Sequence, residues 1–216
     1  MQTVPDIVAS IVRASPYLEE ALAAGIVNHS GLARMIRPEV EREAQKRVQL
    51  GAINVAVGRL ARLVSRRGRP SRKVFRRPPD LIVRLNLFEA TYANSPELFR
   101  KQRDLLARAG PHPQSFLTVT RGINETTIVA SRELRDRILD ACRGERLISQ
   151  IGHLASVTVM LPSGTALIPG VYSFILKALA WEGLNVVEVV STLNEFTVVL
   201  EDGTIEAAFS IIKRLF

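Results

Sequence analysis

The sequence predicts an α+β protein in which a helical N-terminal domain is followed by two related units of strands and helices. Before Asp80, apolar residues recur every three or four positions, as they do along one face of a helix. After Asp80 they alternate with polar residues in short runs, which is typical of half-buried strands. The order strand, helix, strand, strand, helix then occurs twice between residues 81 and 216, which indicates an internal repeat.

Residues 1–67 have the pattern of a helical domain. Ser15 and Pro16 form a helix start, since proline is favoured in the first turn, and this helix is expected to end near Gly25. Asn28 or Ser30 then caps a short helix. Pro38 is expected to stop that helix, because proline lacks the N–H that an interior helical residue donates.

A longer helix is predicted after Gly51. Its buried face is defined by four apolar residues at spacings of four, three and four, namely Ile53, Val57, Leu60 and Val64. Three arginines form a separate stripe on this helix, namely Arg59, Arg62 and Arg66. Short helices, a tight turn and a final helix with one apolar and one basic face resemble a helix-turn-helix or winged-helix domain. Residues 28–36 have the small-residue composition of such a domain's second helix, and the arginine stripe is the expected DNA-facing side.

The excess positive charge of the chain lies entirely in its first third. Residues 1–80 contain 15 Lys and Arg against 7 Asp and Glu, whereas residues 81–216 contain 14 of each. Nine basic residues and no acidic one fall between positions 59 and 77, namely Arg59, Arg62, Arg66, Arg67, Arg69, Arg72, Lys73, Arg76 and Arg77. This pattern predicts contacts with nucleic-acid phosphates. A solvated basic linker, or a surface for an anionic protein or cofactor, is the alternative.

Residues 81–152 are predicted to form the first repeated unit, after a basic linker or wing at residues 68–80. Its strands are expected at residues 81–93, 116–123 and 126–130. Its helices are expected from Ser95-Pro96 to about Ala109 and after Ser131. Residues 147–151 could add a fourth strand.

Residues 153–216 are predicted to form the second unit. Strands are expected at 155–161, 184–191 and 196–201, and helices at 170–181 and 204–215. Each unit should be a small antiparallel sheet with two helices on one face. No fourth strand follows the last helix, so we expect an unpaired sheet edge and therefore a homodimer or larger assembly.

The second unit resembles the ACT domains in the regulatory part of aspartate kinases. The resemblance rests on five segments in order, namely Pro169-Gly170-Val171, Ala178-Leu179, Gly183-Leu184-Asn185-Val186, Glu188-Val189-Val190-Ser191-Thr192 and Phe196-Thr197-Val198-Val199-Leu200. Residues 81–150 look like a more divergent copy, in which Ser95-Pro96-Glu97 stands in place of the Pro-Gly pair. The resemblance implies two ferredoxin-like βαββα(β) ACT units that pair with another copy and bind an amino acid or similar small metabolite.

A ligand site is expected at the loop between a strand end and the helix start at Gly170. The free amides of a helix start attract a carboxylate, and Gly164 and Gly170 allow close backbone approach. Carried over by position, the resemblance implies Ile168, Pro169, Gly170, Val171 and Tyr172 on the loop side, with Asn185 and Val186 near the paired edge. The alternative is that glycine and proline only form the turn here.

Catalysis has the least support, so we expect that the protein is not an enzyme and uses no cofactor. There is no glycine-rich phosphate loop, and the three histidines have no further ligands at metal spacing, which predicts no metal site. The single cysteine, Cys142, fits a small buried apolar role. No apolar run reaches the roughly 18 residues of a membrane span, and the first residues lack a signal-peptide layout. We therefore expect a soluble cytoplasmic protein.

Together these features predict a ligand-responsive regulatory protein. The preferred hypothesis is a transcriptional regulator that binds DNA through its basic N-terminal domain and senses an amino acid through its ACT domains. Two alternatives stay open: a free-standing regulatory subunit of an amino-acid biosynthetic enzyme, and an ACT assembly module without a ligand.

Overall fold

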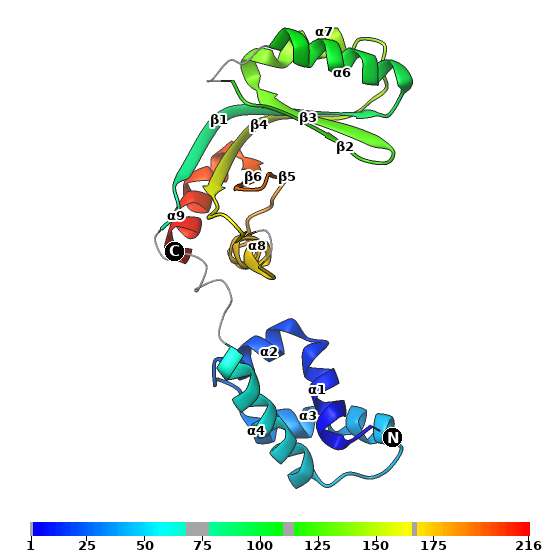
Figure 1. The fold of residues 1–216 in the computed structure, drawn as a ribbon, viewed down its shortest axis with the longest axis vertical. Coiled ribbons are helices and arrows are strands. Elements are labelled where there is room, and N and C mark those ends of the chain that lie inside the picture. Colours follow the sequence, from blue (N-terminus) through cyan, green and yellow to red (C-terminus); the bar gives the residue numbers. More distant parts are fainter. Residues whose placement is uncertain (1, 68–77, 110–114, 166–167) are drawn as a thin grey trace. The chain divides into compact units, whose positions relative to one another are not determined.

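The computed structural model describes residues 2–67, 78–109, 115–165 and 168–216. The chain divides into two compact units, Met1–Pro70 and Ser71–Phe216, here called the N-terminal unit and the sheet unit (Figure 1). Most of the predicted linker at residues 68–80 lies outside the described residues.

Over residues 2–67 the N-terminal unit contains four helices, namely α1 (Val4–Arg13), α2 (Pro16–Ala23), α3 (His29–Ala44) and α4 (Leu50–Arg67). Helix α4 packs against each of the other three. The four apolar residues predicted to form its inner face are all buried in one core. The helical character of residues 1–67 and the buried face of α4 are therefore confirmed.

The starts of α1 and α3 have side-chain caps, whereas Ser15 before α2 makes no side-chain cap hydrogen bond. The Thr3 side chain accepts a hydrogen bond from the N–H of Asp6, and the Asp6 carboxylate accepts one from the N–H of Thr3, which forms a capping box before α1. At α3 the cap is Asn28, whose Oδ1 accepts from the N–H of Gly31 at 2.9 Å. Of the two expected caps, Asn28 and Ser30, the structure therefore uses Asn28.

The predicted stop at Pro38 is wrong, because α3 continues through this proline to Ala44. Pro38 cannot donate to the carbonyl one turn earlier, which disfavours an interior position. Beyond it, however, Val40 and Ala44 are buried in the same core as Leu32 and Ile36. Burial of this second apolar turn offsets the lost hydrogen bond, and the helix ends at Gln45 in a left-handed conformation.

The sheet unit contains one six-stranded sheet, in the order β2-β3-β1-β4-β6-β5, with every neighbouring pair antiparallel. Its strands are β1 (Leu81–Ala93), β2 (Leu117–Arg121), β3 (Glu125–Ser131), β4 (Leu147–Met160), β5 (Glu188–Ser191) and β6 (Glu195–Glu201). Its α-helices are α6 (Pro96–Ala109), α7 (Arg135–Ala141), α8 (Val171–Trp181) and α9 (Ile205–Leu215), with 3-10 turns at Arg132–Leu134 and Asp202–Thr204. The protein is thus of mixed α+β class, as predicted.

The two expected small sheets are joined, because β1 and β4 each run through both halves of the unit. Residues 87–93 of β1 pair with β3, whereas residues 81–84 pair with residues 156–159 of β4. Residues 154–160 of β4 pair with β6. Among the described residues no strand follows α9, but the expectation that this leaves an unpaired edge at β4 is wrong, since the first part of β1 pairs there. The strand expected at 184–191 is also shorter, because only Glu188–Ser191 is regular.

Two residues with left-handed backbone mark the joint between the halves. Asn86 in β1 has φ 57° and His153 in β4 has φ 56°. The β1–β4 register shifts between Arg84 and Leu87 and again between Leu87 and Glu89. Extra residues of this kind form β-bulges, which bend and twist a strand.

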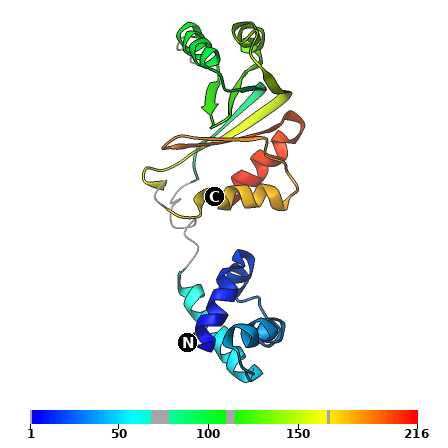
Figure 2. The same cartoon turned by 90° about the vertical axis from the view of Figure 1, so that its right-hand side faces the viewer.

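Each half of the sheet has its own helix pair and core. Helices α6 and α7 pack over β1 and β3, and helices α8 and α9 over β4 and β6. In Figures 1 and 2 the strands lie between these two helix pairs. A further buried cluster contains residues from both halves, namely Leu87, Val129, Leu154 and Val199. These four residues alternate with those under the helices, so they occupy what we call the helix-free face of the sheet.

No helix within the described ranges is long and apolar enough to cross a membrane.

Replacement of His153 tests the role of the left-handed position. His153→Gly should raise the free energy of unfolding by about 0.5 to 1 kcal/mol, because glycine removes the steric penalty that a side chain meets at positive φ. His153→Val should lower it by about 1 kcal/mol or more, since a β-branched side chain tolerates this conformation least. Urea unfolding followed by circular dichroism and by Trp181 fluorescence, from the chain's single tryptophan, would measure both.

Gln150→Val is the matched control, because Gln150 is an exposed residue of the same strand and is not among those with positive φ. Equal effects of valine at positions 150 and 153 would contradict the assignment of strain to the bulge.

Candidate functional site

The two halves of the sheet unit have comparable junctions between a strand and the following helix. In the first half, Asn94 and Ser95 connect β1 to α6. In the second, residues 161–170 connect β4 to α8, and this is the loop for which the sequence predicted a ligand.

The β4–α8 junction places its predicted residues partly in the core. Gly170 is the N-cap of α8 with φ 89°, and no side chain caps the helix start. Val171 is only 1% exposed, and Tyr172 stacks on Phe196 with ring centroids 4.6 Å apart. Ile168 packs partly against the same core. On the loop side, the exposed elements of the predicted site are thus Pro169 and Gly170 with the uncapped helix start.

The two residues predicted near the paired edge differ from each other. Val186 is half-buried against the core cluster that also contains Val171. Asn185 is exposed, and its side chain has no hydrogen bond to any described residue. The structure therefore brings Val186 into the same core as Ile168 and Tyr172, and leaves Asn185 at the surface.

A hollow of about 460 Å³ lies at the β1–α6 junction, which sequence reasoning did not select. Its lining consists of Asn94, Ser95, Pro96, Phe99, Arg100 and Arg121. The Arg121 guanidinium lies 5.3 Å from the centre of the Phe99 ring, a cation–π contact. Arg100 forms an exposed ion pair with Glu97 at 3.5 Å. This hollow combines two guanidinium groups with an exposed aromatic ring, which suits a small carboxylate with an apolar part.

The walls of this hollow are held by hydrogen bonds of Asn94. Its Nδ2 donates to the carbonyls of Gly122 at 2.9 Å and Ile123 at 3.1 Å, and its Oδ1 accepts from Thr126 Oγ1 at 2.6 Å. These bonds tie the β2–β3 hairpin, which presents Arg121, to the start of α6. They hold the backbone next to Arg121 close to the start of α6, the helix that carries Phe99.

A second network holds the start of α6 from the other side. Ser95 Oγ accepts from the N–H of Leu98 at 2.8 Å and donates to Glu145 at 2.6 Å. Lys101 Nζ donates to the other oxygen of Glu145 at 2.7 Å. The hydrogen bond from Lys101, followed by that from Ser95, lowers the pKa of Glu145.

The buried cysteine fits the apolar role expected for it. Cys142 lies in the core of the first half, and burial raises the pKa of its thiol. The neighbouring Tyr92 is buried too, which raises its pKa to about 12. No group of three or more His, Cys, Asp or Glu within the described ranges could hold a metal ion.

The described part of the basic segment lies on α4. Arg59 and Arg62 are exposed, and their guanidinium groups have no hydrogen bond or ion pair with a described residue. Arg66 and Arg67 belong to the same helix, but their side chains are outside the description. The other five predicted residues lie beyond the described ranges, namely Arg69, Arg72, Lys73, Arg76 and Arg77.

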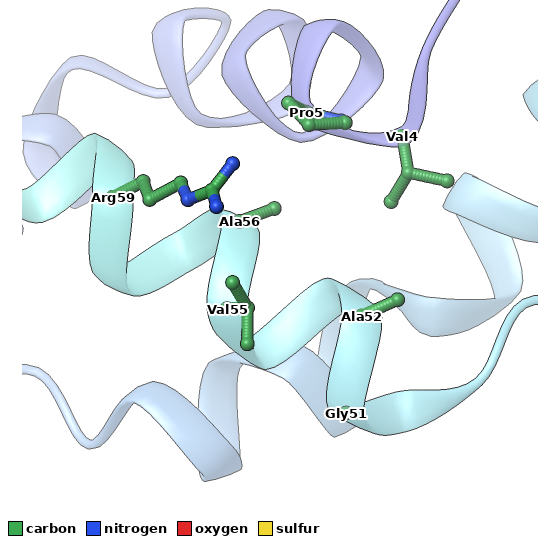
Figure 3. Close-up of a pocket in the computed structure, with 7 residues that line it drawn as sticks. All are labelled: Val4, Pro5, Gly51, Ala52, Val55, Ala56 and Arg59. Atoms are coloured by element: carbon green, nitrogen blue, oxygen red, sulfur yellow. The ribbon is translucent and has the colours of Figure 1, made fainter.

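Arg59 also borders a hollow of about 330 Å³ between the start of α1 and α4. Its other lining residues are Val4, Pro5, Gly51, Ala52, Val55 and Ala56. Figure 3 shows the Arg59 side chain lying between these helices, near Ala56. Among the described lining residues it is thus the one charged group of a mainly apolar groove.

Comparison with known proteins identifies the fold. The structure is similar to the ligand-free regulatory subunit of aspartate kinase from Thermus thermophilus, with a TM-score of 0.53 and 15% identity, over 65% of this chain and 99% of that one. The regulatory subunit from Thermus flavus gives a TM-score of 0.51 and 17% identity, over 65% and 99%. Aspartate kinase from Clostridium acetobutylicum gives 0.51 and 16%, over 63% of this chain and 34% of that longer one. The resemblance to ACT-domain regulatory regions is therefore confirmed for the fold.

Sequence comparison adds nothing to this structural likeness. No protein-family model matches the chain, and no curated protein matches it.

Substitution of Glu145 tests the network beneath α6. Glu145→Gln should lower the free energy of unfolding at pH 7 by about 1 to 2 kcal/mol, since the charged hydrogen bond from Lys101 is lost. Because the pKa of Glu145 is lowered in the folded state, its stabilisation is present above the ordinary pKa of glutamate and is lost as pH falls. Urea unfolding at pH 3.5 to 7 should therefore show a smaller acid loss in the variant.

Glu182→Gln, at an exposed glutamate after α8, is the control and should leave the pH profile unchanged. A wild-type acid profile in Glu145→Gln would exclude the proposed contribution of this network.

Proposed function

We propose that the chain is a regulatory protein in which the sheet unit senses an amino acid or similar small metabolite and the N-terminal unit binds DNA. The single observation on which the sensing role rests is the hollow lined by Phe99, Arg100 and Arg121. Its volume of about 460 Å³ falls in the range of small-molecule sites.

The chemistry of this hollow suits an amino acid. A guanidinium pairs with a carboxylate through two parallel hydrogen bonds, so Arg121 and Arg100 supply the anion-binding side. Phe99 offers an apolar surface for the side chain of the ligand. Glu97, on the first turn of α6, supplies a carboxylate near Arg100 that can attract an ammonium group.

The β4–α8 junction is the alternative position for the same ligand. Its support is the uncapped start of α8, whose amides can receive a carboxylate beside Pro169 and Gly170. Under this alternative Ile168, Val171 and Tyr172 form the apolar floor, with Asn185 and Val186 near the edge. We favour the β1–α6 junction because it presents the exposed charged side chains of Arg100 and Arg121.

The two halves are proposed to be two ACT units that share one sheet. Each has two helices on one face of its strands, as the repeated order of elements requires. Strands β2 and β5 end the sheet, and neither has a second neighbouring strand among the described residues. These open edges support a homodimer or larger assembly.

DNA binding by the N-terminal unit is supported by the exposed arginines of α4. Arg59 and Arg62 lie away from the buried face of the helix and have no described acid partner. The fold around them is four helices with α4 in contact with all others, which is compatible with a helix-turn-helix-like domain.

A regulatory subunit of an amino-acid biosynthetic enzyme is the second candidate. It is favoured by one finding, namely that two of the structural neighbours are themselves regulatory subunits of aspartate kinase. In this case the basic N-terminal unit would dock on the enzyme. Co-purification of an enzyme together with no affinity for DNA would support it over the first proposal.

A thermal-shift screen with the twenty amino acids tests the sensing role. A specific ligand at about 100 times its Kd should stabilise the sheet unit by about 2.7 kcal/mol. Arg121→Gln should abolish this shift, because it removes the charge next to Phe99. Pro169→Ala should leave it unchanged if the β1–α6 junction is the site.

Arg214→Gln serves as the control for loss of one positive charge, since Arg214 is exposed on α9. Loss of the shift in Pro169→Ala but not in Arg121→Gln would move the site to the β4–α8 junction. No shift with any amino acid would support an assembly module instead.

Fluorescence anisotropy on duplex DNA at about 50 and 200 mM salt tests the nucleic-acid role. Each phosphate contact contributes about 0.9 to the slope of log K against log salt. Arg59→Gln and Arg62→Gln should each reduce this slope by about that amount. Arg13→Gln, at an exposed arginine of α1, is the charge-matched control. No binding at the lower salt concentration would refute DNA as a partner.

A further inference from the structure

A buried glutamate lies on the helix-free face of the sheet. Glu89 is in β1, between Leu87 and Thr91 on the same face, and is only 7% exposed. Thr91 Oγ1 donates to its Oε1 at 3.4 Å, and its Oε2 is buried without a hydrogen-bond partner. A buried carboxylate with so few donors is costly when ionised, so this environment favours the neutral acid.

The nearest strands supply no countercharge to Glu89. Its partner on β3 is Val129 and its partner on β4 is Ile151. The adjoining positions on this face are Thr127 and Ser149, which are also uncharged.

Two further charged residues on this face lie on β1 and β5. On β1 itself, Arg84 shares the face, where its guanidinium lies 5.9 Å from the centre of the Phe116 ring. On β5, Glu188 pairs with Val199, which belongs to the buried cluster on this face. Burial first, and the charge of Glu188 second, raises the pKa of Glu89, while the hydrogen bond from Thr91 opposes this.

The two carboxylates belong to different halves of the sheet. Glu89 lies in the part of β1 that pairs with β3, and Glu188 lies in β5, at the far end of the strand order. Val199, the pairing partner of Glu188, belongs to the same buried cluster as Leu87, the neighbour of Glu89 on this face. This cluster joins the two halves, because Val129 lies in β3 and Val199 in β6.

We propose that Glu89 is a proton-dependent switch that sets how tightly the two halves of the sheet unit pack across their helix-free faces. The neutral acid allows the cluster of Leu87, Val129, Leu154 and Val199 to close. The ionised form places an unpaired charge beside this cluster and opposite Glu188. It therefore favours a looser arrangement of β5 and β6 against β1 and β3.

The sign of the pH dependence follows from the direction of the pKa change. A group whose folded-state pKa is raised stabilises the fold fully below its ordinary pKa and loses this contribution as pH rises through the folded value. The packing between the halves should therefore weaken from acidic towards neutral and alkaline pH. This inference does not depend on the identity of any ligand or on DNA binding.

Glu89→Gln in the full chain tests the switch, because glutamine keeps the size and removes the charge. At pH 8 the variant should melt about 2 to 4 °C above the wild type, and at pH 4.5 the two should melt together. At pH 8 its hydrogen exchange in β5 and β6 should be slower than in the wild type. Comparison at equal pH removes the intrinsic pH effect on exchange. Glu195→Gln, at an exposed position of β6, is the control.

Glu188→Gln provides an independent test that leaves Glu89 itself unchanged. It should lower the pKa of Glu89, measured by carbon NMR of the side-chain carboxyl groups, because it removes the like charge. A Glu89→Gln effect that is the same at both pH values, or an unchanged Glu89 titration in Glu188→Gln, would overturn the proposal. A dependence on added cations rather than on pH would overturn it in favour of a bound cation.

Discussion

The pairing of β1 with β4 is the constraint on which the rest of the sheet unit depends. Each of these strands belongs to both halves, so neither half has four strands without the other. The left-handed residues Asn86 and His153 bend the pair where the halves meet. On the helix-free face, Val129 and Val199 from different halves belong to one buried cluster.

The same strand, β1, also positions the side chains that form the hollow and the buried carboxylate of Glu89. The end of β1 sets the place of Asn94, whose side chain ties the β2–β3 hairpin to α6 and so holds Arg121 beside Phe99. The middle of β1 places Glu89 between the halves, where it lacks a partner for one oxygen. A change of register in one ladder would therefore disturb the hollow and the buried carboxylate together.

Local patterns predicted the elements well, because the apolar periodicity of a helix or strand is a property of neighbouring residues. The inner face of α4 and the full extent of β1 were predicted for this reason. The continuation of α3 past Pro38 was not predicted, since it depends on the burial of Val40 in the core of the N-terminal unit. The fourth strand of the second half was not predicted either. It is the first part of β1, and the alternation of apolar residues along a strand does not reveal which strands it pairs with. The hollow at Phe99 and Arg121 escaped prediction likewise, as only the fold brings that helix and hairpin together.

The contrast between the two junctions has a physical reason. At Gly170 the family-like motif is well formed, and its side chains at Val171 and Tyr172 are used to pack the core. A side chain packed in this way cannot also rearrange around a ligand without loss of core contacts. At the β1–α6 junction the motif is absent, but Phe99 and Arg121 stay at the surface while hydrogen bonds of Asn94 hold the backbone beneath them. The side chains of the β4–α8 junction thus pack the core, whereas those of the β1–α6 junction stay exposed, and this difference is the physical ground for preferring the β1–α6 junction in the proposed sensing role.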